Sequence, residues 1–156
     1  MKILLTTDGS SFSESALQAI TSTIRTEGSE VLVLEVVEPL VFTTPPQMAP
    51  GYAPEQMARL KEQFQEAEKT TAECTEILRK AGFKVDSRVV ESDVRSGILQ
   101  TAGEWEPDLI VMGSHGRRGV EKFLLGSVAE SVARHAKCSV LIVRGTPKAA
   151  AAVQAA

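Results

Sequence analysis

A glycine-rich segment between residues 113 and 127 contains the residues best suited to chemistry. It reads Gly113-Ser114-His115-Gly116-Arg117-Arg118-Gly119 and, after a short apolar stretch, ends in Gly126-Ser127. Glycines let the backbone approach a ligand closely and adopt positive φ angles, and free N–H groups in such a loop form a concavity that binds anions. A helix that begins at Gly126-Ser127 would favour negative charge at its N-terminus. Together with the cations Arg117, Arg118 and Lys122, these features indicate a polyphosphate site.

A second polar loop follows the first apolar run of the chain and reads Thr6-Thr7-Asp8-Gly9-Ser10-Ser11. At the end of a strand, Asp8 is placed to accept hydrogen bonds from a sugar hydroxyl or to hold the water of a metal ion. Both loops also have a purely structural interpretation. Asp8, Ser10 or Ser11 can cap a following helix, and the glycine-rich segment can be a turn with a helix cap.

Two common phosphate loops are absent from the sequence. It contains no G-x-x-x-x-G-K-[ST] segment, which excludes a P-loop. It also lacks G-x-G-x-x-G after the first apolar run, so the dinucleotide-binding fingerprint is missing.

Short apolar runs and helical patterns alternate along the chain and predict the frame that positions these loops. Runs at 3–5, 31–37, 109–112 and 140–143, and a weaker alternating run at 85–90, are typical of strands. Their near-continuous apolarity indicates a sheet covered on both faces. Helical patterns occupy 12–26, 54–81, 94–105 and 127–136. Pro54 suits a first helical position, Gly82 a C-terminal cap, and Asp93 an N-terminal cap.

The alternation of strands and helices predicts an α/β fold, an open parallel sheet with right-handed crossovers and helices on both faces. In such a sheet ligands bind beyond the carboxyl ends of the strands, where the strand order reverses. Both polar loops follow strands and are expected at that edge. The proline-rich segment 38–53 is predicted to be a loop, and no function is assigned to the Ala-rich tail 145–156.

Length and composition fit one globular domain that is large enough to need no stabilising disulfides or metal sites. The chain has 156 residues, 17 Lys and Arg against 20 Asp and Glu, and a net charge of −3, which argues against nucleic-acid binding. Cys74 and Cys138 make no disulfide framework and lack the spacing of a zinc site. Neither a signal segment nor an apolar run of membrane-spanning length is present. We therefore expect a cytoplasmic protein.

At the glycine-rich segment the sequence resembles the universal stress protein family. The pattern G-x-x-G, nine residues, then G-[S/T] is met by Gly113, Gly116 and Gly126-Ser127, and it marks the ATP-binding branch of that family. The resemblance extends over about residues 2–144 and includes the stretches 3–10, 34–39, 108–116 and 138–144. It implies a universal stress protein-like domain at 1–144, followed by the short tail.

The resemblance also implies a Rossmann-like sheet ordered 3-2-1-4-5, with ATP at the switch point between strands 1 and 4. Asp8 would then meet the ribose, while Thr6 and Val36 would line the adenine slot, Val36 through its backbone. Met112 and Gly113 would form the floor. The phosphates would be held by backbone N–H groups and a serine hydroxyl, from Gly116, Gly126, Ser127 and Val128. Mg²⁺ would be bound mostly by the nucleotide and water.

Two positions depart from the family pattern. Glu35 replaces the histidine often found before the adenine-slot valine, and Ser139 replaces a common proline. His115, between two glycines, is expected to contact a phosphate or to face solvent.

The family further implies dimers. Strand 5 would form an apolar sheet edge, Val140, Leu141, Ile142 and Val143, suited to pairing with a second copy. A helix or the tail covering this edge is the alternative. The expected function is a nucleotide-binding regulatory module in a stress response. A slow ATPase or nucleotidyl-transfer enzyme using Asp8 or His115 is the first alternative, and a dimer-only protein without nucleotide the second. The sequence names no protein partner.

Overall fold

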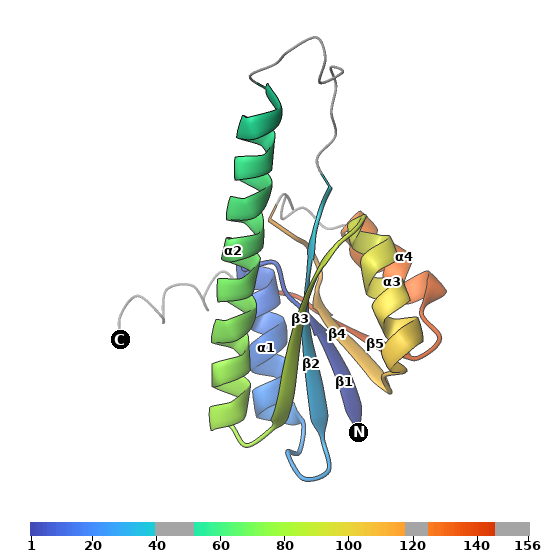
Figure 1. Cartoon of the computed structure of the whole chain (residues 1–156). Coiled ribbons are helices and arrows are strands. Elements are labelled where there is room, and N and C mark those ends of the chain that lie inside the picture. Colours follow the sequence, from blue (N-terminus) through green and yellow to red (C-terminus); the bar gives the residue numbers. More distant parts are fainter. Residues whose placement is uncertain (40–51, 118–124, 146–156) are drawn as a thin grey trace.

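A computed structural model of the chain contains one five-stranded sheet with helices on both faces (Figure 1). The structure describes residues 1–39, 52–117 and 125–145. The elements follow in the order β1 (Lys2–Thr6), α1 (Ser11–Thr23), β2 (Glu30–Val37), α2 (Tyr52–Lys80), β3 (Lys84–Glu91), α3 (Val94–Trp105), β4 (Leu109–Gly113), α4 (Ser127–His135) and β5 (Ser139–Val143). The predicted α/β alternation is therefore confirmed.

The strand order is β3-β2-β1-β4-β5, and every pairing is parallel, as the resemblance implied. The central strand β1 pairs with β2 on one side and β4 on the other; Leu4, for example, lies opposite Leu32 and Ile110. The strand order thus reverses between β1 and β4. At this switch point the loops after the two strands leave the same edge of the sheet, which brings Asp8 close to the glycine-rich segment.

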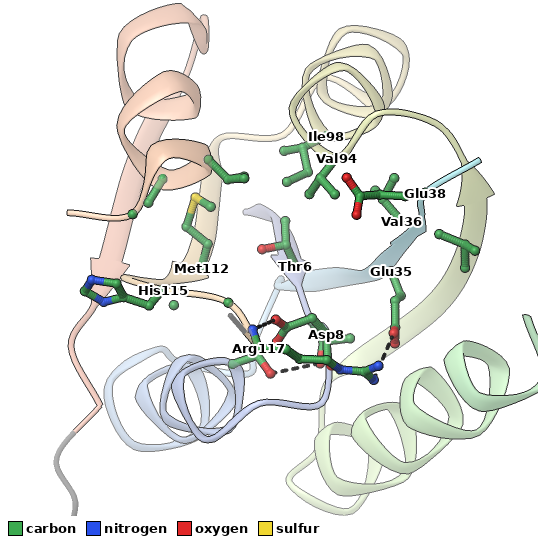
Figure 2. Close-up of a pocket in the computed structure, with 18 of the residues that line it drawn as sticks. Thr6, Asp8, Glu35, Val36, Glu38, Val94, Ile98, Met112, His115 and Arg117 are labelled. Atoms are coloured by element: carbon green, nitrogen blue, oxygen red, sulfur yellow. Dashed lines mark hydrogen bonds and ion pairs between the residues drawn. The ribbon is translucent and has the colours of Figure 1, made fainter. Parts of the chain in front are cut away.

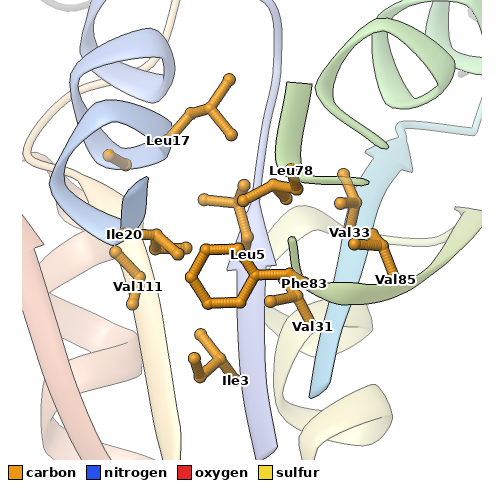
Figure 3. Packing of buried hydrophobic residues seen from close by; sticks show 11 residues of the cluster. Ile3, Leu5, Leu17, Ile20, Val31, Val33, Leu78, Phe83, Val85 and Val111 are labelled. Atoms are coloured by element: carbon orange, nitrogen blue, oxygen red, sulfur yellow. The ribbon is translucent and has the colours of Figure 1, made fainter. Parts of the chain in front are cut away.

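Alternate residues of the strands build two apolar layers, one on each face of the sheet. On the face covered by α1 and α2, Ile3 and Leu5 of β1 pack with Leu17, Leu78 and Phe83, which are all buried (Figure 3). The opposite face packs Leu4, Leu32 and Ile110 against Ile98 of α3 and Val132 of α4. Each fully buried side chain of this size contributes roughly 1.5–3 kcal/mol. Burial on both faces explains why the strand runs are almost continuously apolar.

Local signals set most helix ends. Asp93 caps α3 by accepting a hydrogen bond from the Ser96 N–H at 3.1 Å, as predicted. The predicted range 12–26 was too long, because Ile24 adopts an extended conformation (φ −98°, ψ 137°) and α1 ends at Thr23.

The two residues predicted to mark the ends of α2, Pro54 and Gly82, have different outcomes in the structure. The helix begins at Tyr52, so Pro54 is its third residue and not its first. Proline is tolerated there because the first N–H groups of a helix have no partner within it. The helix ends at Lys80, one residue before the predicted end at 81, and Gly82 follows with a φ of +98°.

Three further sequence predictions concern the surface and the cysteines. The strand β5 lies at a sheet edge, and its Leu141 is 39% exposed. Among the described residues no helix is both long and apolar enough to cross a membrane. Cys74 and Cys138 are free and half-buried, and burial raises the pKa of both thiols.

Three segments with sequence predictions lie outside the described residues. They are the segment 40–51, the tail 146–156 and residues 118–124, which include Arg118, Gly119 and Lys122.

Candidate functional site

A cavity of about 590 Å³ opens at the carboxyl ends of β1, β2 and β4 (Figure 2). Eleven residues that the sequence analysis placed in the site line this cavity, namely Thr6, Asp8, Val36, Met112, Gly113, His115, Gly116, Arg117, Gly126, Ser127 and Val128. The predicted cations Arg118 and Lys122 lie outside the described residues. The cavity therefore brings together residues from opposite ends of the chain, at the switch point of the sheet. This is the place where open α/β sheets bind ligands.

One part of the cavity is apolar. Thr6, Val36 and Met112 face the same side of the sheet as Val94 and Ile98 of α3 (Figure 2). A slot of this chemistry suits a flat aromatic base, which gains from burial and makes few polar demands. The sequence analysis assigned Val94 and Ile98 to the helix stripe and missed their second role. Because such stripes usually mark core, their pattern carried no signal for a ligand.

Asp8 connects the two loops at the switch point. Its Oδ1 accepts hydrogen bonds from the Ser10 N–H (3.0 Å) and from the Ser10 hydroxyl (2.6 Å). Its Oδ2 accepts one from the Arg117 N–H at 2.8 Å. Ser10 in turn caps α1, so the structural interpretation of this loop is correct for Ser10. A carboxylate has roughly four acceptor positions, so Asp8 retains capacity for one more donor, such as a sugar hydroxyl.

The N-terminus of α4 forms the polar end of the cavity. Gly126 is the N-cap and supplies no capping side chain, so the N–H groups of Ser127 and Val128 have no partner within the helix. The Gly126 N–H itself donates to the Ser114 carbonyl at 2.9 Å. Free N–H groups and the helix dipole at this end favour an anion.

The glycines of this segment are required for close packing and not for unusual backbone angles. Among the described residues only Gly9, Gly28 and Gly82 are glycines with positive φ. A Cβ atom on Gly113 would lie 2.8 Å from the Phe12 backbone, and one on Gly126 would lie 2.8 Å from the Ser114 carbonyl oxygen. The positive φ angles that the sequence analysis allowed for are therefore not used at Gly113, Gly116 or Gly126.

His115 lies at the cavity wall and is held by its neighbours. Its Nδ1 lies 3.1 Å from the Ser114 hydroxyl, and its ring centroid is 5.1 Å from that of Phe12. The imidazole is half-buried and lines the cavity. This placement suits a contact with a ligand at the polar end.

The side chain of Arg117 lies among carboxylates, although its charge was expected to serve phosphates. Its Nε donates to the Asp8 carbonyl. Its Nη2 lies 3.7 Å from Glu35 Oε1 and 3.7 Å from Glu66 Oε1 (Figure 2). The guanidinium thus joins the end of β2, the loop after β1 and helix α2. The sequence analysis noted Glu35 only as a departure from the family pattern.

Glu35 is the one charged residue in the interior of β2, whose other interior residues are apolar. Consecutive residues of a strand point to opposite faces, so Glu35 faces α1 and α2 while Val36 faces α3. The Glu35 side chain is only 8% exposed, and its Oε2 has no hydrogen-bond partner among the described residues. Burial raises the pKa of this carboxyl from 4.5 to about 7; Arg117 opposes the rise, and the charges of Asp8 and Glu66 add to it.

The described residues offer no protein cage for a metal ion. Within residues 1–39, 52–117 and 125–145, no three His, Cys, Asp or Glu side chains are grouped as metal ligands.

Comparisons with known proteins point to one family. A sequence model of the universal stress protein family matches residues 1–144. Universal stress protein MJ0531 of Methanocaldococcus jannaschii is 35% identical over 147 residues, which cover 94% of this chain and 84% of the relative. The solved structure of the hypothetical protein MJ0577 is 28% identical, with a TM-score of 0.79 and coverage of 93% of this chain and 96% of that one.

Two more distant structures share the fold and contain nucleotides. A universal stress protein in complex with cAMP is 22% identical, with a TM-score of 0.67 over 94% of this chain and 98% of that one. A universal stress protein family protein of Arabidopsis thaliana with AMP bound is 16% identical, with a TM-score of 0.62 over 96% and 94% of the two chains. At these identities the likeness concerns the fold.

Proposed function

This chain belongs to the universal stress protein family, and we propose that it is a regulatory module that binds an adenine nucleotide at the switch point between β1 and β4. The observation that carries the proposal is the cavity itself. It combines an apolar slot, a carboxylate with a free acceptor position and an uncapped helix N-terminus. These are complementary to a base, a ribose and a phosphate chain, in that order.

The base, the ribose and the phosphates of the nucleotide each have a proposed contact in the cavity. The base lies against Val36 and Met112 beside Thr6, and the ribose hydroxyls donate to Asp8. The phosphates accept from the N–H groups of Ser127 and Val128, near Gly116 and His115. Related folds bind AMP and cAMP, which supports an adenine nucleotide as the ligand class.

ATP with Mg²⁺ is the nucleotide that we propose. The dipole of α4 and its free N–H groups stabilise negative charge near the helix end, so further phosphates strengthen binding there. Mg²⁺ usually keeps several waters and binds through substrate phosphates. No protein ligand for the ion is proposed.

We also propose that the protein acts as a dimer through β5. This strand is an edge of the sheet, and its Leu141 is an exposed large apolar residue. An apolar edge with unpaired backbone groups is a template for pairing with another copy. The stress response served by the dimer and its location in the cytoplasm stay predictions from the sequence.

The first experiment identifies any nucleotide that copurifies with the protein. The protein is purified without added nucleotide and denatured, and the released small molecules are analysed by chromatography and mass spectrometry. Released ATP supports a holding function, since slow turnover is needed for it to survive. Released ADP or AMP supports the alternative of a slow ATPase and calls for a turnover assay. An empty protein is titrated with Mg·ATP.

Calorimetric titration with Mg·ATP then tests the contacts. Asp8→Ala removes a hydrogen bond to a charged group, so we expect a loss of about 1.5–3 kcal/mol, or roughly tenfold to a hundredfold in affinity. The matched control is Asp86→Ala, because Asp86 is exposed on β3 and does not line the cavity. Absence of binding to the wild type, together with absence of released nucleotide, would overturn the proposed function.

A further inference from the structure

The ion pair between Glu35 and Arg117 plays no part in the nucleotide contacts proposed above. We propose that Arg117 leaves Glu35 for the phosphates of the bound nucleotide, and that Glu35 takes up a proton as the arginine leaves, so that nucleotide binding is linked to pH. The inference rests on the proposed function, because the phosphates supply the competing charge. It makes Glu35 a positioning residue that acts on the ligand through Arg117.

The first observation is the position of the arginine. Arg117 lines the same cavity as Ser127 and Val128, the proposed phosphate donors. Its side chain is 48% exposed, so reorientation needs little repacking and breaks one hydrogen bond, from its Nε to the Asp8 carbonyl. Its two carboxylate contacts are long, at 3.7 Å each. Arginine pairs with phosphate through two parallel hydrogen bonds, and a polyphosphate offers a denser charge than these carboxylates do.

The second observation is the environment of Glu35. Its side chain is buried, and Oε2 has no hydrogen-bond partner among the described residues. Such a group depends on its counter-charge, because an isolated buried carboxylate is strongly disfavoured and takes a proton instead. The arginine that supports ionisation is the group that the phosphates attract.

The charges of two other groups around Glu35 oppose its ionisation. From the loop after β1 it is faced by the negative charge of Asp8, and from α2 by that of Glu66. The thiol of Cys74, also on α2, has its pKa raised by burial first and by the charge of Glu35 among smaller causes. On β3 the residue in register is the uncharged Val89. Arg117 is the only one of these neighbours that favours the ionised carboxylate.

The proposal predicts the direction in which nucleotide affinity changes with pH. In the free protein the carboxyl of Glu35 has a pKa of about 7, and loss of Arg117 raises the pKa further. Binding therefore takes up protons, at most about half a proton at pH 7 and at most about one at pH 8. The affinity is constant well below pH 7 and falls by up to about tenfold per pH unit above it.

The experiment is calorimetric titration with Mg·ATP at pH 6, 7 and 8, in pairs of buffers that differ in their ionisation enthalpy. Glu35→Gln imitates the protonated side chain. It is expected to match the wild type at pH 6, to bind about tenfold more tightly at pH 8, and to lose the proton uptake. The matched control is Glu66→Gln, which removes a carboxylate at the same 3.7 Å from the same nitrogen but with a 63% exposed side chain. We expect it to keep the proton uptake.

A variant of the arginine separates the linkage from a general structural effect. Arg117→Met is expected to lose proton uptake as Glu35→Gln does, but to weaken binding at all three pH values. Equal pH profiles in the wild type and Glu35→Gln overturn the linkage and leave the proposed function standing. Absence of Mg·ATP binding to the wild type at every pH overturns both.

Discussion

The buried carboxyl of Glu35 predicts an unusual pH dependence of stability. In the unfolded chain its pKa is near the ordinary 4.5, and in the folded protein burial raises the pKa to about 7. Between these values the folded protein binds more protons, so its free energy of unfolding falls as the pH rises from 4.5 to 7. The difference corresponds to about 3 kcal/mol, which is lost in full above pH 7.

Glu35→Gln removes this ionisation and is the perturbation of choice. We expect the variant to be more stable than the wild type by about 3 kcal/mol at pH 8 and of similar stability at pH 4. For a chain of this size the gain at pH 8 corresponds to roughly 6–12 °C in Tm. Urea unfolding without nucleotide, followed by circular dichroism at several pH values, measures the difference directly. Other carboxylates titrate in both proteins and cancel in the comparison.

A difference in the free energy of unfolding between the two proteins that stays constant across this pH range would refute the reasoning. It would show that the carboxyl ionises in the folded protein as it does in the unfolded chain. A variant less stable than the wild type at pH 8 would refute it more strongly, because the pairing with Arg117 would then outweigh the burial of Glu35.

Three further predictions concern separate parts of the molecule. Gly126→Ala places a Cβ 2.8 Å from the Ser114 carbonyl oxygen, and we expect a loss of about 1–3 kcal/mol in stability by urea unfolding and weaker Mg·ATP binding by calorimetry. Leu141→Lys puts a charge on the β5 edge and is expected to yield monomers by light scattering; a dimer of unchanged mass would exclude this edge. Cys74 and Cys138 have pKa values raised by burial, and both are expected to react with iodoacetamide at pH 7 more slowly than glutathione does.

The sequence predicted the fold well because the signals that specify it are local. Continuous apolar runs such as Val31–Leu34 require cover on both faces, and this pattern alone separates a parallel sheet from a half-exposed one. The capping side chain of Asp93 gave the start of α3 to the residue, and the glycine at 82 gave the end of α2 to within one residue. The end of α1 was placed too late, because Ile24 keeps the apolar spacing of the helix while its backbone is already extended.

The lining of the cavity was predictable where it follows the strands and unpredictable where it depends on side-chain direction. Asp8 and Gly113 follow β1 and β4 directly, so the topology places them. The direction of Arg117 depends on two carboxylates and one backbone carbonyl that are distant from it in sequence, and no local pattern encodes that meeting. Glu35 carried a signal, a lone charge within an apolar strand, but its surroundings are set by tertiary packing alone.

The buried charge of Glu35 lowers both the stability of the free protein and its affinity for the proposed nucleotide. A glutamine there would fill the same space without the burial of a charge, so by stability alone the carboxylate is unfavourable at neutral pH. In the free protein its partial ionisation holds Arg117 at 3.7 Å, away from the phosphate end of the cavity. The same ionisation therefore weakens the fold and competes with the nucleotide, and one proton relieves both effects. Stability of the free protein is thus expected to decline as the pH rises from 4.5 to 7, and affinity for Mg·ATP to decline as it rises further above 7. A variant that raises one by removing this charge raises the other as well.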